Sequence, residues 1–100
     1  MRSLLVFLLI SLIAAIPLRA QTAPTDLDKL LQDGTRAYEK RDFTQAARLF
    51  ADVLARAAPG PQLEPVAFFH AAALVESGET ERAIKTLVEF PKKYPSSPRI

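Results

Sequence analysis

The sequence predicts an all-α protein made of two antiparallel helical hairpins behind an N-terminal signal peptide. Apolar residues recur every three or four positions after residue 25, and the same pattern occurs twice, with Ala46 and Ala83 37 residues apart. A third observation is the long apolar run near the start of the chain. We expect the chain to consist of a signal peptide over 1–20, a flexible lead-in over 21–25, a first hairpin over 26–60, and a second hairpin with a C-terminal tail over 61–100.

The first 20 residues have the composition of a cleavable signal peptide. Arg2 gives a positive start, and residues 4–16 are almost entirely apolar. As a helix these 13 residues would span about 20 Å, less than the roughly 30 Å hydrocarbon core of a bilayer. Ala20 suits the position before a cleavage site, so we expect cleavage before Gln21 and a periplasmic or secreted product. Membrane contact would then be transient; the alternative is an uncleaved membrane anchor.

The charge balance after the signal peptide argues against a nucleic-acid partner. The whole chain has a formal net charge of +2, but Arg2 and Arg19 precede the predicted cleavage site, and all 11 acidic residues follow it. The mature chain would therefore be neutral. Binding to phosphate backbones requires a clustered excess of Lys and Arg. We expect no nucleic-acid binding.

The first hairpin is predicted from apolar spacing and from helix-capping signals. One stripe at helical spacing contains Leu27, Leu30, Leu31, Ala37 and Tyr38. Thr25 and Asp28 have the spacing of a capping box, and Asp42 with Gln45 repeats that spacing at the start of a second helix. Residues 58–61, Ala-Pro-Gly-Pro, should end the second helix, because proline lacks the N–H donor that a helix needs.

The second hairpin is predicted from the same kinds of signal. Pro65 suits the first turn of a third helix, and Gly78 suits the left-handed position after its end. Thr80 is expected to cap a fourth helix. Pro91 should kink or end that helix near Phe90, since an interior proline removes one backbone hydrogen bond.

The pattern shared by the two hairpins resembles the tetratricopeptide repeat, a helix–turn–helix unit of about 34 residues. The matching residues are Gly34, Tyr38, Asp42, Phe43, Ala46, Phe50, Leu54 and Pro59 in the first copy, and Ala71, Gly78, Ala83, Ile84, Leu87 and Pro95 in the second. The resemblance implies that small residues lie where helices cross and that Phe50 and Leu87 fill the space between hairpins. Residues 90–97 further resemble repeat exits in bacterial envelope proteins, such as the periplasmic protein of the Tol–Pal system and the barrel-assembly lipoprotein.

In tetratricopeptide arrays the first helix of each repeat lines the concave face. The resemblance therefore implies a protein-binding face formed by Leu31, Thr35, Tyr38, Glu39, Phe68, Ala72, Val75 and Glu76. The carboxylate-gripping members of the family carry Lys and Asn at the places of Leu31, Thr35, Phe68 and Ala72, so a different ligand is expected. An extended or helical apolar segment of another protein suits this mostly apolar face.

The alternative is that these residues only pack against a further repeat or a second copy of the chain. Helical-repeat arrays generally need about three repeats and a polar terminal cap. Two hairpins that end at Ile100 would leave Leu87 and Phe90 exposed. The chain would then be a structural piece of a longer array or a self-associating subunit.

No catalytic, cofactor-binding or metal-binding residues are expected. The chain has no cysteine and a single histidine, His70, which alone makes neither a metal cluster nor a catalytic triad. Gly34, Gly60 and Gly78 are too far apart for a phosphate-binding loop. We therefore expect an exported scaffold that works by binding another protein and not as an enzyme.

Overall fold

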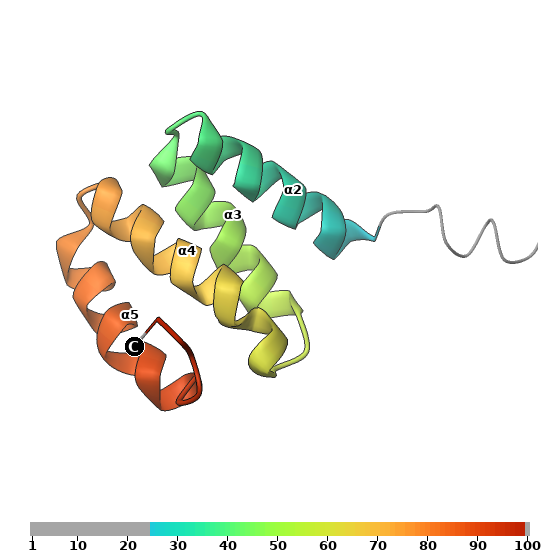
Figure 1. Cartoon of the computed structure of the whole chain (residues 1–100). Helices are drawn as coiled ribbons and strands as arrows, with labels where there is room; N and C mark the ends of the chain where they lie inside the picture. The colour runs from blue at the N-terminus through green and yellow to red at the C-terminus, as the bar shows by residue number, and fades with distance from the viewer. Residues whose placement is uncertain (1–24, 100) are drawn as a thin grey trace, which may run out of the picture.

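The computed structural model describes residues 25–99, and all the regular elements in that range are helical (Figure 1). The elements are α2 over Asp26–Glu39, α3 over Phe43–Arg56, the short 3-10 helix η1 over Pro61–Leu63, α4 over Glu64–Glu76 and α5 over Thr80–Lys93. Helices α2 and α3 form one antiparallel hairpin, α4 and α5 form a second, and α3 packs against α4. The predicted all-α class is confirmed. The predicted signal peptide and most of the lead-in lie outside the described residues.

The two hairpins turn in the same way, 37 residues apart. Each turn contains one residue in the left-handed conformation, Arg41 with φ 64° and Gly78 with φ 83°. The residue after Arg41, Asp42, donates its backbone N–H to the carbonyl of Ala37 over 2.9 Å. In the same way Glu79, the residue after Gly78, donates to the carbonyl of Leu74 over 3.1 Å, so both bonds reach five residues back. The bounds of α3 and α5 are also offset by 37 residues. The prediction that Gly78 takes the left-handed position is confirmed.

Side-chain caps fix the starts of α2 and α3. The Thr25 hydroxyl accepts a hydrogen bond from the N–H of Asp28 over 3.1 Å, and the Asp28 carboxylate accepts one from the N–H of Thr25 over 3.2 Å. The Asp42 carboxylate accepts a hydrogen bond from the N–H of Gln45 over 3.3 Å. Both predicted helix starts are confirmed.

One predicted feature of α5, its capping residue, is wrong, and of the two outcomes expected at Pro91, a kink or an end of the helix, the end is wrong. The residue that caps α5 is Glu79, which makes no side-chain capping bond, while Thr80 is already helical and donates its hydroxyl to the carbonyl of Gly78. The helix also continues through Pro91 to Lys93. Pro91 lies on the exposed side of the helix, where water can hydrogen-bond the carbonyl that the proline leaves without a donor.

Small residues lie where the helices cross, as predicted. Ala46, Ala71 and Ala83 are buried, and Gly34 lies against the ring of Phe50. Helix α4 occupies the centre of the stack because it carries apolar residues all around its circumference and can pack on two neighbours at once.

The predicted burial of Leu87 between hairpins is wrong. Phe50 is 3% exposed, but Leu87, 37 residues later, is 48% exposed, and Ile84 and Val88 are similarly exposed. The reason is positional: α3 lies between α2 and α4, whereas α5 has extensive contacts with α4 alone among the described helices. The outer side of α5 is therefore an exposed apolar stripe. The expectation that Phe90 is also exposed there is wrong, because Phe90 is 8% exposed and its ring packs against those of Phe68 and Tyr94.

Candidate protein-binding face

The predicted binding residues divide between α2 and α4. Leu31, Thr35, Tyr38 and Glu39 lie on α2, while Phe68, Ala72, Val75 and Glu76 lie on α4. Tyr38, Phe68 and Ala72 are half-buried, and the other five are exposed. The Thr35 hydroxyl donates to the carbonyl of Leu31 over 2.8 Å, so its proton is already used within the helix.

An aromatic pair joins the two helices. The rings of Tyr38 on α2 and Phe69 on α4 meet edge to face, with centroids 5.3 Å apart and planes at 75°. This contact places Tyr38, one of the predicted residues of α2, beside α4. We call the surface formed by the eight predicted residues and Phe69 the α2/α4 face.

The Tyr38–Phe69 pair belongs to a longer row of rings. In order, the row contains Phe43, Tyr38, Phe69, Phe68, Phe90 and Tyr94, with neighbouring centroids 5.2 to 6.5 Å apart. It links the four α-helices of residues 25–99 and the C-terminal tail. Because such rings make favourable offset contacts in addition to the burial of their area, the row holds the two hairpins in register.

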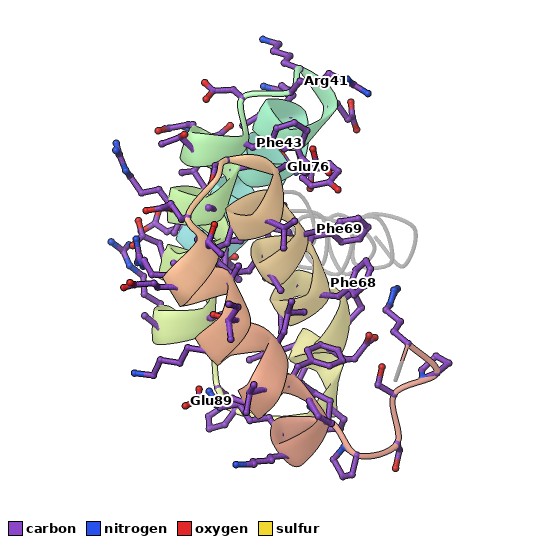
Figure 2. The ribbon with its side chains drawn as sticks, turned by 90° about the vertical axis from the view of Figure 1, so that its left-hand side faces the viewer. Arg41, Phe43, Phe68, Phe69, Glu76 and Glu89 are labelled. Carbon is purple, nitrogen blue, oxygen red and sulfur yellow. The ribbon has the colours of Figure 1, made fainter. Side chains whose placement is uncertain are left out.

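Phe69 is the site residue that sequence reasoning missed. It lies three residues before Ala72 and seven before Glu76, so helical spacing alone places it on the same face. Figure 2 shows Phe68 and Phe69 pointing to the same side of α4. This is also the side that the end of the C-terminal tail reaches.

The C-terminal tail, residues 94–99, is not helical and covers one end of the face. The Arg99 guanidinium lies 4.5 Å from the ring centroid of Phe68. Its Nε donates to Glu64 Oε1 over 2.9 Å, and the Ser97 hydroxyl donates to the same oxygen over 3.1 Å. Sequence reasoning had no signal for these contacts, since 35 residues separate Glu64 from Arg99.

The two helices of the face carry an excess of acidic residues. Helix α2 contains four carboxylates against Lys29 and Arg36, and α4 contains Glu64 and Glu76 with no Lys or Arg. Helix α5 has the opposite balance, with four basic and two acidic residues. Within residues 25–99, the helices that form the α2/α4 face are therefore the negative part.

A cleft of about 1020 Å³ opens between the C-terminal halves of α3 and α5, over α4, and Glu64 is one of its lining residues. Its walls include Leu54, Ala67, His70 and Phe90, and the tail closes one end. Burial, together with the positive charge of Arg82, lowers the pKa of His70, although the charge of Glu79 acts in the opposite direction. A mostly neutral imidazole at neutral pH fits a half-buried structural residue.

Residues 25–99 contain no cluster of three or more side chains suited to hold a metal ion. None of the helices in that range has the length and apolar character needed to cross a membrane. Comparison with protein-family models, with curated proteins and with solved structures gave no match to the chain.

Proposed function

We propose that the chain is an exported tetratricopeptide scaffold of the cell envelope that binds a segment of another protein on the α2/α4 face. The observation that carries the proposal is the Tyr38–Phe69 contact, which sets two helices side by side with apolar side chains exposed along both. Leu31 and Val75 are among these exposed side chains. An elongated apolar face of this kind suits an extended or helical segment.

The repeat assignment is supported by the way the two hairpins match. They share one turn geometry, one helix offset and small buried residues at the crossings, Ala46 in the first hairpin and Ala83 in the second. Such equivalence is typical of helical-repeat proteins, in which each unit buries its apolar side only by stacking on a neighbour. Repeat proteins of this type commonly work through extended binding surfaces.

The binding proposal is tested by photo-crosslinking in cells that export the full chain. A benzophenone amino acid at Phe69 is compared with one at Arg48, which is exposed on α3. We expect discrete adducts at position 69, identifiable by mass spectrometry, and their loss when Tyr38→Ala is added. Equal adducts at positions 69 and 48, or none at 69, would contradict the proposal.

The export proposal has its own test. The intact mass of the protein recovered outside the cytoplasm should correspond to a chain that begins at Gln21. A recovered chain that retains residues 1–20, or one that stays in the cytoplasm, would overturn it. This mass measurement tests localisation only, and the binding proposal is tested by the crosslinking experiment.

A second candidate function, a structural piece of a longer array or a self-associating subunit, is favoured by the exposed stripe of Ile84, Leu87 and Val88 on α5. Helix α4 contributes Val66 and Ala73 to the same buried cluster as Phe50 and Val53 of α3. The residues 37 positions earlier in α2 are Lys29 and Arg36. Because these are charged, α2 of another copy would have to bury two charges to cover α5 in the way that α4 covers α3.

The second candidate therefore needs a covering helix patterned like α4. Light scattering of the purified protein over a range of concentrations distinguishes the two candidates. A monomer at all concentrations favours a self-contained binding module. A stable dimer that is lost on Leu87→Lys favours association through the α5 stripe.

A further inference from the structure

The contact of Arg99 with the α2/α4 face has the composition of a binding site for an arginine side chain. The guanidinium lies over the Phe68 ring at 4.5 Å and is 5.9 Å from the Phe69 ring. At the same time its Nε donates to the Glu64 carboxylate over 2.9 Å. A planar cation that stacks on a ring while its edge pairs with a carboxylate is the arrangement that distinguishes Arg from Lys.

The ion pair in this contact is the most protected one among residues 25–99. Its side chains are 15% exposed for Glu64 and 33% for Arg99, whereas every side chain in the other three ion pairs of that range is at least 39% exposed. Shielding from water strengthens an ion pair and a cation–π contact alike. Glu64 is therefore placed to bind a cation selectively, and it lies in a helix with no basic residue of its own.

The tail that supplies Arg99 leaves α5 with a backbone hydrogen bond from the N–H of Tyr94 to the carbonyl of Phe90, and its hydrogen bonds to α4 are made by side chains. Two hydrogen bonds lie within the tail. The N–H of Ser97 donates to the carbonyl of Tyr94, and the N–H of Arg99 donates to the Ser97 hydroxyl. The polar contacts of residues 95–99 with α4 both end on Glu64, one from Ser97 and one from Arg99. A segment of another protein with an arginine at the same place can make these contacts equally well.

We propose that Glu64 and Phe68 form an arginine subsite of the α2/α4 face, and that the chain's own tail occupies it until a partner segment carrying an arginine replaces Arg99. This inference rests on the proposed protein-binding function and adds the chemistry of the partner. The acidic excess on α2 and α4 favours the approach of such a basic segment. The tail then acts as an internal competitor that lowers the apparent affinity for the partner.

The test is an NMR titration of the full mature protein with a blocked peptide, Ser-Ser-Pro-Arg-Ile, that copies residues 96–100. We expect Arg99→Ala to bind this peptide about tenfold more tightly than the wild type, because the subsite is no longer occupied in the variant. The same peptide with citrulline, which is neutral and nearly the same shape, should bind the variant about tenfold more weakly than the arginine peptide.

Two further variants in the Arg99→Ala background locate the binding. Glu64→Gln and Phe68→Leu should each weaken binding, while Glu89→Gln, a carboxylate outside the contact, should not. Helical circular dichroism checks that each variant is folded. Equal affinity of wild type and Arg99→Ala, or equal binding of the arginine and citrulline peptides, would overturn the subsite. If the arginine peptide does not bind Arg99→Ala while crosslinks at position 69 persist, the subsite is wrong and the proposed function stands.

Discussion

Gly34 and Phe50 meet where α2 crosses α3, and a Cβ atom on Gly34 would lie 2.9 Å from Cε1 of the Phe50 ring. The ring is buried and has no free space into which to move. Glycine at this position therefore permits the close approach of the two helices within the first hairpin. The equivalent position in the second hairpin is Ala71, which is buried, and the residue equivalent to Phe50 is Leu87, which is smaller and 48% exposed.

Gly34→Ala should destabilise the protein by about 1 kcal/mol. The overpacking costs about 1–3 kcal/mol, and the better helix propensity of alanine returns up to about 1 kcal/mol. Urea unfolding followed by circular dichroism measures the change. In a Phe50→Leu background the same substitution should cost less, because the smaller side chain leaves room. A Gly34→Ala protein more stable than the wild type would show that propensity outweighs packing here.

The two left-handed turn residues should respond in opposite directions to substitution. Gly78→Ala should lower the free energy of unfolding by about 1 kcal/mol, because a Cβ is strained at φ 83°. Arg41→Gly should raise it by up to about 1 kcal/mol by releasing the same strain at φ 64°. Thermal and urea unfolding of both variants provide the comparison. Changes of the same sign would mean that the turns are not equivalent in solution.

Equivalent large residues on α3 and α5 should contribute unequally to stability. Phe50→Ala should cost about 3–5 kcal/mol because it opens a cavity in the core. Leu87→Ala should cost less than about 1 kcal/mol, since half of that side chain is exposed. A cost of several kcal/mol for Leu87→Ala in dilute protein would indicate that the α5 stripe is covered, which would favour the second candidate function.

His70 should make the protein less stable in mild acid. Its pKa is lowered in the folded state, chiefly by burial, so the unfolded chain binds a proton more readily. The stability supplied by neutral His70 is complete above the unfolded pKa of about 6.5 and declines as the pH falls below it. Denaturant unfolding between pH 5 and pH 8 measures this loss. The free energy of unfolding should fall less steeply with decreasing pH in His70→Gln than in the wild type. Identical pH profiles of the two proteins would show that His70 is not the group responsible.

The helices and their starts were predictable from the sequence because they depend on local signals. Capping residues such as Thr25 and Asp42 act within one turn, and apolar periodicity reports which side of a helix is buried. The start and end of α5 were not predicted. Glu79 occupies the capping position because the turn at Gly78 repeats the turn at Arg41, and Pro91 is tolerated because it is exposed.

The α2/α4 face was predictable only in part. Helical spacing and the family resemblance placed Tyr38 and Phe68, but the ring contact between Tyr38 and Phe69 depends on how the hairpins stack. The tail contact between Arg99 and Glu64 depends on a chain reversal after α5. Neither follows from a local pattern, because each joins residues more than 30 positions apart.

The central claim is that the two hairpins stack so that α2 and α4 form one face. A solution NMR measurement of nuclear Overhauser effects between the ring protons of Tyr38 and Phe69 tests it most directly. The account predicts clear cross peaks, because the ring centroids are 5.3 Å apart. A folded helical protein without those cross peaks would show that the hairpins do not form the α2/α4 face.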